Sequence, residues 1–162
     1  MLLACGQPRN GTSMLMRTLK FGGVNICYDT AVDTPRRKRK MRNPHGFFEI
    51  TKDTPRTGTW KVWRAGGLKR HPEARVIFIQ RDLEQVHKSW LAMGTNRDVK
   101  VIQRMRDRME EEVAKHDHVK VSFEQMFIDP RCELERIKAF LHGKFDVDTA
   151  LTAIDETLHR ER

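Results

Sequence analysis

The chain has 162 residues, of which 38% are hydrophobic and 33% are charged, and this length suits a single domain over residues 1–162. Its 31 Lys and Arg outnumber its 22 Asp and Glu, giving a net charge of +9, so an anionic partner is expected. No run approaches the roughly 20 apolar residues of a membrane-spanning helix. The 3 cysteines are widely spaced, which predicts neither a disulfide framework nor a zinc site and favours a cytoplasmic location.

The first residues predict a strand, a loop and a helix in direct succession. Residues 1–5 are a short apolar run typical of a buried strand, and the loop Gly6–Gly11 follows at once. Residues Thr12–Phe21 carry an apolar stripe at helical spacing, and the pair Gly22-Gly23 ends the predicted helix.

The next segment contains two predicted strands separated by a basic stretch. We expect the strands at Val24–Tyr28 and Thr59–Trp63. Residues 29–58 between them are polar and proline-containing, which predicts a long loop or lid with at most short helical pieces. Five consecutive basic residues, Arg36–Lys40, lie within this lid.

The second half of the chain repeats the alternation of strands and helices. Its clearest strand is Arg75–Gln80, in which four consecutive residues are apolar. Strands that are apolar throughout and alternate with helices predict an α/β fold, with a P-loop-like three-layer domain and a central parallel sheet of about five strands flanked by helices. The remaining predicted elements are a helix over residues 83–93 capped by Asp82, a charged helix over residues 97–115, a strand at Val119–Ser122, a helix from Pro130 to Leu141, and a last helix capped by Asp148 that runs through Leu158.

The first loop carries the strongest functional signal. Gly6-Gln7-Pro8-Arg9-Asn10-Gly11-Thr12-Ser13 has the spacing of a Walker A phosphate-binding loop, except that Thr12 replaces the lysine. Glycines let backbone N–H groups turn inward, and the helix that follows adds the positive end of its dipole, so the loop predicts an anion site. Without the lysine, a terminal phosphate or sulfate suits the loop better than a nucleoside triphosphate with magnesium. A glycine turn with no ligand is the alternative interpretation.

Four segments in this order resemble sulfotransferases that use 3′-phosphoadenosine 5′-phosphosulfate (PAPS). The resemblance spans about residues 1–143 and implies a P-loop-type α/β fold, PAPS as co-substrate, 3′,5′-adenosine bisphosphate as product, and no metal. The matching segments are Pro8-Arg9-Asn10-Gly11-Thr12-Ser13, Asn43-Pro44-His45-Gly46-Phe47-Phe48-Glu49, Val76-Ile77-Phe78-Ile79-Gln80-Arg81 followed by Ser89, and Val121-Ser122-Phe123-Glu124-Gln125-Met126 followed by Asp129-Pro130.

The resemblance implies two anion-binding ends. Pro8, Arg9, Asn10, Gly11, Thr12 and Ser13 are expected to bind the 5′-phosphosulfate, with Arg9 as the main cation. A fixed cation and loop N–H groups stabilise the charge that develops as the sulfuryl group leaves. Thr12 and Ser13 can also simply cap the helix. Arg81 and Ser89 are expected to share the 3′-phosphate, and the alternative for Arg81 is a surface ion pair with Asp82 or Glu84.

Three further residues are candidates for the transfer chemistry. The resemblance favours Glu49 as the general base that removes the acceptor's proton, and His45 is the competitor because imidazole suits this role near neutral pH. Lys61 is expected to be a second cation near the sulfuryl group. Phe47 and Phe48 are expected to pack the lid onto the sheet.

Two other functions are consistent with parts of the sequence. A P-loop kinase or nucleotide-binding protein would share the loop spacing, although it would require the lysine that Thr12 replaces. A catalytically inactive binder of polyanions or nucleic acid would use the run Arg36–Lys40, but we expect nucleic acid to be the less favoured partner. The expected acceptor is a small molecule or a glycan, anionic if the basic lid attracts it. The sequence leaves its identity and the oligomeric state open.

Overall fold

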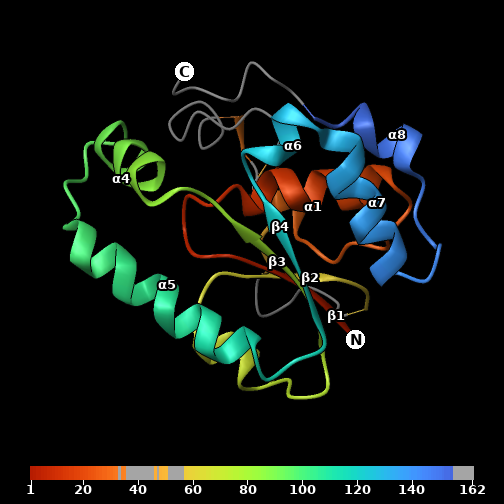
Figure 1. Cartoon of the computed structure of the whole chain (residues 1–162), viewed down its shortest axis with the longest axis horizontal. Coiled ribbons are helices and arrows are strands. Elements are labelled where there is room, and N and C mark those ends of the chain that lie inside the picture. The colour runs from red at the N-terminus through yellow and green to blue at the C-terminus, as the bar shows by residue number, and fades with distance from the viewer. Residues whose placement is uncertain (33, 36–45, 47, 51–56, 155–162) are drawn as a thin grey trace.

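The computed structural model describes residues 1–32, 34–35, 46, 48–50 and 57–154. This part of the chain is an α/β structure in which strands and helices alternate, as Figure 1 shows. None of its helices is long and apolar enough to cross a membrane. The elements in chain order are β1 (Leu2–Cys5), α1 (Thr12–Phe21), the 3-10 turn η1 (Thr30–Val32), β2 (Trp60–Val62), α3 (Ala65–Leu68), β3 (Arg75–Gln80), α4 (Leu83–Leu91), α5 (Val99–Val113), β4 (His118–Ser122), α6 (Gln125–Ile128), α7 (Pro130–Phe140) and α8 (Val147–Leu151).

The four strands form one parallel sheet in the order β2-β1-β3-β4. In its register, Ala4 of β1 lies between Lys61 of β2 and Ile77 of β3. Because every pairing is parallel, the carboxyl ends of all four strands lie at the same edge of the sheet. The prediction of an α/β fold with a parallel sheet flanked by helices is confirmed.

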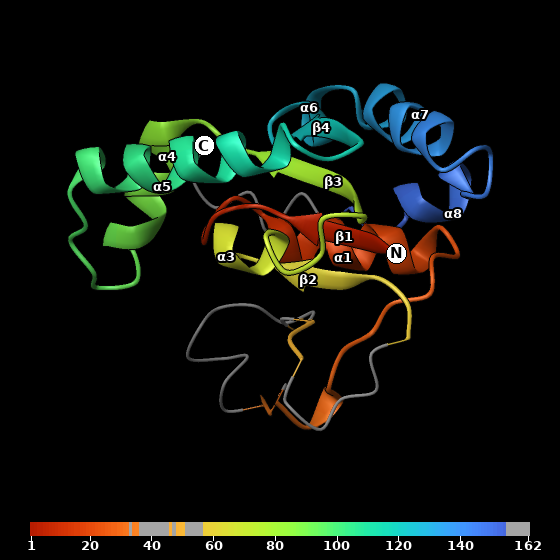
Figure 2. The same ribbon diagram turned by 90° about the horizontal axis from the view of Figure 1, so that it is seen from below.

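Helices cover both faces of this sheet (Figures 1 and 2). Successive side chains of a strand point to opposite faces, so β3 contributes Ile77 and Ile79 to one hydrophobic cluster and Val76 and Phe78 to the other. The first cluster joins α1, α6, α7 and α8, whereas the second joins α3 and α5. The apolar run of β3 is therefore explained by burial on both sides.

The core under α7 should tolerate loss of side-chain volume poorly. Ile137 is 0% exposed, so Ile137→Ala should lower the free energy of unfolding by roughly 2–5 kcal/mol, because it removes buried contacts and leaves a cavity. Chemical denaturation measures this value. Ile128 is 73% exposed, and Ile128→Ala should leave stability within about 0.5 kcal/mol of the parent. Equal losses in the two variants would contradict the packing described above.

The sheet differs from the sequence-based prediction at one edge. Five strands were expected, but the described residues contain four, and Val24–Tyr28 makes only an isolated parallel bridge between Ile26 and Thr59. This bridge lies beside the edge strand β2. The described chain that follows α1 makes this one pairing and does not extend it into a strand.

The C-terminal helix also begins elsewhere than predicted. The cap of α8 is Asp146, whose Oδ1 accepts a hydrogen bond from Thr149 N at 3.1 Å. The hydrogen bonds from Thr149 lower the pKa of Asp146. Asp148 was the predicted cap, but it lies in the first turn and pairs with Arg131 at 2.6 Å. The helix ends at Leu151, and residues 155–162 of the predicted helix lie outside the described residues. Two short helices, α3 and α6, were not predicted.

Candidate functional site

The carboxyl edge of the sheet brings together segments that are far apart in sequence. The loop Gly6–Gly11 follows β1, Trp63 follows β2, Arg81 follows β3 and Phe123 follows β4. In open α/β sheets this edge is where ligands bind. We call Gly6–Gly11 the β1–α1 loop.

The β1–α1 loop is tightly held against β3. Asn10, 1% exposed, donates its side-chain amide to the Ile79 carbonyl at 3.2 Å, and its backbone N–H donates to Gln7 O at 3.2 Å. A Cβ on Gly6 would lie 2.8 Å from that same Ile79 oxygen, so glycine is needed for the close approach. The Asn10 side chain, which the sulfotransferase resemblance assigns to the cofactor, thus fixes the loop's position.

The end of the loop is packed beneath an aromatic ring. Gly11 has a φ of 87°, and a Cβ there would lie 2.3 Å from the Phe123 ring. The same ring also contacts Arg81, whose guanidinium carbon lies 4.3 Å from the ring centroid. Phe123 therefore fixes both the loop and the Arg81 side chain through packing and a cation–π contact.

Arg9, Arg81 and Ser89 form one cluster. Arg9 Nε donates to Ser89 Oγ at 2.8 Å, and Arg81 Nη1 donates to the Arg9 carbonyl at 3.3 Å. Ser89 is 2% exposed and Arg81 is 8% exposed. The alternative interpretation of Arg81, a surface ion pair with Asp82 or Glu84, is wrong, because Arg81 is buried and Asp82 caps α4 by accepting from Gln85 N at 3.0 Å. Arg9 lies beside the residues expected at the 3′-phosphate, which the sequence did not indicate.

Lys61 and Glu49 lie at a second position next to the same loop. Lys61 Nζ donates to Ser13 Oγ at 3.3 Å and lies 3.9 Å from Glu49 Oε1. Glu49 is held in place by its neighbour Phe48, which is buried in the core, and by its own carbonyl, which accepts from Asp29 N at 2.8 Å. The Glu49 side chain is 35% exposed and the Lys61 side chain 8%. The competing residue His45, with Phe47 and Arg36–Lys40, lies outside the described residues.

Among the described residues, no side chain caps the N-terminus of α1. Gly11 is the N-cap residue, it makes no side-chain cap bond, and the first turn contains no acidic residue. The alternative role of Thr12 and Ser13 as caps of this helix is therefore not seen among the described residues: Thr12 is the first residue of the helix, and Ser13 Oγ accepts from Lys61 Nζ. The Asp residues at positions 82, 98, 129 and 146 cap α4, α5, α7 and α8. The first amides of a helix have no intrahelical partner, so the start of α1 offers donors to an anion.

Sequence reasoning missed two residues at this site. Phe123 lies in a segment that the resemblance covers, but its contact with Gly11 and Arg81 depends on β4 standing next to β3. Gln7 is 2% exposed, and neither Nε2 nor Oε1 has a hydrogen-bond partner among the described residues. Buried polar groups nearly always have a partner, so Gln7 fits a loop that receives polar atoms from a ligand. Its position within the loop motif was the available signal.

Cysteines and possible metal ligands are the other reactive groups to consider near the loop. Burial raises the pKa of the Cys5 thiol, so this cysteine at the end of β1 is a neutral packed side chain. All three cysteines are free. No group of three or more His, Cys, Asp and Glu that could hold a metal occurs within the described residues.

No model of a known protein family matches the sequence, and no curated protein matches it either. The geometry at this edge of the sheet is therefore the basis for assigning a function.

Proposed function

We propose that the protein is a sulfotransferase that transfers a sulfuryl group from PAPS to a hydroxyl or amine of a small-molecule or glycan acceptor. The observation that carries the proposal is the arrangement around the β1–α1 loop. Arg9 of this loop forms a cluster with Arg81 and Ser89, and Lys61 contacts Ser13 in the first turn of α1. Cationic groups at two positions around one P-loop-like turn suit a nucleotide with anionic groups at both its 3′ and its 5′ positions.

Each group then has a role in the transfer. Arg81 and Ser89 bind the 3′-phosphate, with Arg9 beside them. Lys61, the second cation expected near the sulfuryl group, and the amides at the start of α1 bind the 5′-phosphosulfate, where Arg9 was expected to be the main cation. The buried Lys61 ammonium stabilises negative charge more strongly than an exposed one, because water screens it less.

Glu49 serves as the general base in this proposal. Its carboxylate accepts the acceptor's proton while the acceptor oxygen or nitrogen forms a bond to sulfur. The bond from sulfur to the 5′-phosphate oxygen breaks, and its electron pair stays on that oxygen, whose charge Lys61 stabilises. The products are the sulfated acceptor and 3′,5′-adenosine bisphosphate, and no metal is required. Lys61 lies 3.9 Å from Glu49, so the base and the cation are adjacent.

Nucleotide binding tests this proposal without knowledge of the acceptor. We expect 3′,5′-adenosine bisphosphate to bind more tightly than 5′-AMP, because only the bisphosphate reaches Arg81 and Ser89 with a 3′-phosphate. Arg81→Ala should weaken bisphosphate binding by roughly 10- to 100-fold, as loss of about 1.5–3 kcal/mol of charged hydrogen bonding implies. The 5′-AMP affinity should change little. Calorimetric titration measures all four values.

Two controls make this result specific. Arg131→Ala removes an arginine whose side chain is 58% exposed and pairs with Asp148, and it should leave both affinities unchanged. Arg81→Lys keeps the charge but loses the planar fork, so it should give an intermediate loss even if Arg81→Ala folds poorly. Binding of ATP with magnesium, without binding of the bisphosphate, would instead support the kinase hypothesis. Turnover of labelled PAPS over an acceptor panel then identifies the reaction.

A further inference from the structure

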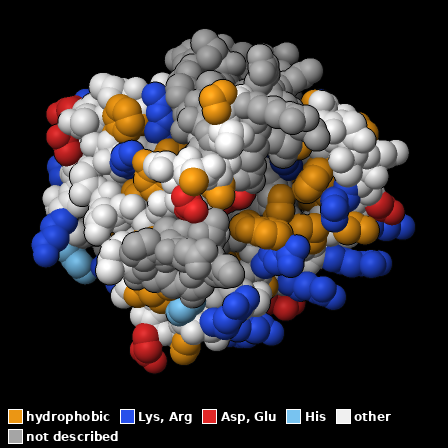
Figure 3. Space-filling view, turned by 180° about the vertical axis from the view of Figure 1, so that it is seen from behind, with side chains coloured by type: hydrophobic (Ala, Val, Ile, Leu, Met, Phe, Trp, Pro, Cys, Tyr) orange, Lys and Arg blue, Asp and Glu red, His pale blue; other side chains and the backbone are white. Residues whose placement is uncertain are grey.

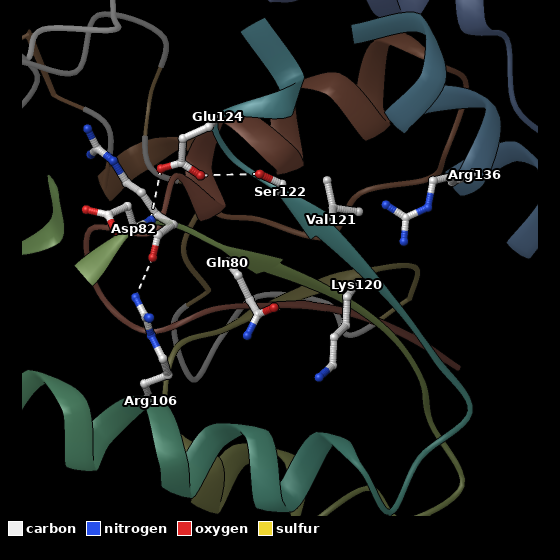
Figure 4. A pocket seen from close by; sticks show the side chains of 9 residues that line it. Gln80, Asp82, Arg106, Lys120, Val121, Ser122, Glu124 and Arg136 are labelled. Atoms are coloured by element: carbon white, nitrogen blue, oxygen red, sulfur yellow. Dashed lines mark hydrogen bonds between the residues drawn. The ribbon is translucent and has the colours of Figure 1, made fainter. Parts of the chain in front are cut away.

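A pocket lies at the opposite edge of the sheet from Lys61. Its volume is about 320 Å³, and it opens along β4, which is the edge strand. Figure 4 shows side chains from the strands, α5 and α7 around it. The lining residues are Gln80, Arg81, Asp82, Arg106, Lys120, Val121, Ser122, Glu124 and Arg136.

The pocket is distinct from the site at the β1–α1 loop, although Arg81 borders both. The Arg81 guanidinium donates to the Arg9 carbonyl, whereas the Arg81 carbonyl accepts a hydrogen bond from Arg106 of α5. One residue thus presents its side chain to the loop and its backbone to the pocket.

Positive charge dominates the lining. It contains four cationic side chains and two carboxylates. Both carboxylates accept internal hydrogen bonds: Glu124 from Asp82 N at 2.9 Å and from Ser122 Oγ at 3.3 Å, and Asp82 from Gln85 N at 3.0 Å. Glu110 lies behind the lining and accepts from Gln80 Nε2 at 2.5 Å. These carboxylates are thus tied to neighbouring donors, whereas Lys120, Arg106 and Arg136 have further N–H donors that can face a ligand.

Lys120 is the lining cation with the fewest described partners. It is exposed, and it has no side-chain hydrogen bond or ion pair within the described residues. In the register of the sheet it stands beside Phe78, on the face that packs against α5. Figure 4 shows Lys120 and Gln80 both extending toward α5, from which Arg106 rises. Arg136 of α7 flanks the opening above them.

The protein already binds one of its own carboxylates beside this pocket. Glu133 is 5% exposed; its Oε2 accepts from the outward-facing Ser122 N at 3.1 Å, and its Oε1 accepts from Arg136 at 2.8 Å. A backbone N–H of the edge strand and the Arg136 guanidinium therefore both donate hydrogen bonds to the buried Glu133 carboxylate. Since alternate residues of a strand face the same edge, the N–H of Lys120 points outward as that of Ser122 does.

From this arrangement we propose that the pocket binds a small molecule through an oxyanion group, with Lys120, Arg106 and Arg136 as its donors. Its volume lies at the lower end of the range for small-molecule sites, which suits a compact polyanion. Phosphoryl and carboxylate groups share the required chemistry. The proposal does not depend on the sulfotransferase assignment, because it uses neither Lys61 nor Glu49.

The test is calorimetric titration of the full chain with two probes, pyrophosphate and citrate. Tighter binding of pyrophosphate would assign a phosphoryl ligand, and tighter binding of citrate a carboxylate ligand. We expect Lys120→Ala to weaken the better probe at least 10-fold and Lys120→Ala/Arg136→Ala to weaken it further. Lys120→Ala should fold normally because the side chain is exposed.

Two control variants decide whether the pocket is the binding site. Lys144→Ala removes the same charge from an exposed position outside the lining and should leave binding unchanged. Lys61→Met, which removes a cation beside the β1–α1 loop, should leave the Lys120-dependent binding unchanged. Equal affinity in the parent and in Lys120→Ala would overturn the proposal. So would binding that is lost in Lys61→Met and kept in Lys120→Ala, since the probe would then occupy the β1–α1 loop. Binding of 3′,5′-adenosine bisphosphate, measured separately in Lys120→Ala, should match the parent.

Discussion

Glu49→Gln should reduce sulfuryl transfer by roughly 10²- to 10⁴-fold, the range over which a positioned general base accelerates a reaction. Glutamine keeps the size of the side chain and can still accept a hydrogen bond through its carbonyl oxygen, but it cannot take up the acceptor's proton. The affinity for 3′,5′-adenosine bisphosphate should stay within about twofold of the parent, because Glu49 contacts Lys61 rather than the Arg81 cluster. Steady-state rates with labelled PAPS and calorimetric titration give the two quantities.

The controls for this variant separate the base from its surroundings. Glu84→Gln neutralises a glutamate whose side chain is 73% exposed and lies 3.0 Å from Lys88, so transfer should be unchanged. His45→Ala removes the competing base and should retain most of the activity. If His45→Ala abolishes transfer while Glu49→Gln does not, the imidazole is the base. Lys61→Met should slow transfer as well, because it removes the cation beside Ser13.

Gly11→Ala should nearly abolish bisphosphate binding and destabilise the fold by about 2–5 kcal/mol. Two effects add: an alanine at positive φ costs about 1–2 kcal/mol, and overpacking costs about 1–3 kcal/mol. The overpacking arises because the new Cβ would lie 2.3 Å from the Phe123 ring. Displacement of that ring would also move Arg81, which stacks against it at 4.3 Å. Thermal unfolding and bisphosphate titration measure the two losses.

The other end of α1 supplies a matched control for Gly11→Ala. Gly23 has a φ of 88°, and a Cβ there would meet nothing within 4 Å, so Gly23→Ala carries the backbone strain alone. It should destabilise the protein by only about 1–2 kcal/mol and leave nucleotide affinity intact. Phe123→Ala in the Gly11→Ala background should recover part of the stability difference, because it removes the clash. Identical behaviour of the two glycine variants would show that the Phe123 contact does not matter.

The candidate site could be predicted from sequence only in its parts. The loop motif and the segments that resemble sulfotransferases selected Arg9, Lys61, Arg81 and Ser89 as candidates. The sequence did not show which of these residues contact one another in the folded protein. Arg9 and Ser89 are 80 positions apart, and Lys61 and Ser13 are 48 positions apart. Their contacts exist because β2 and β3 pair on either side of β1, an order that no local pattern encodes.

The sequence alone determined the elements whose signals are local. The limits of α1 at Thr12 and Phe21 were predicted correctly, because glycines flank an apolar stripe at helical spacing. The strand Arg75–Gln80 was equally clear, because both of its faces are buried and apolar. Turn-forming residues and the spacing of apolar side chains act over a few residues, so the sequence alone predicts the helices and strands that they define.

Only the tertiary structure decided the strand order, the caps and the packing of the site. Val24–Tyr28 has the composition of a strand, yet it forms a single bridge, because its pairing depends on how the chain passes the edge of the sheet. Asp146 and Asp148 are equally good caps by type, and the fold selected Asp146. The basic pocket along β4 likewise unites residues of two strands and two helices. Long-range packing sets these features, since their energy comes from contacts between elements rather than from preferences within one.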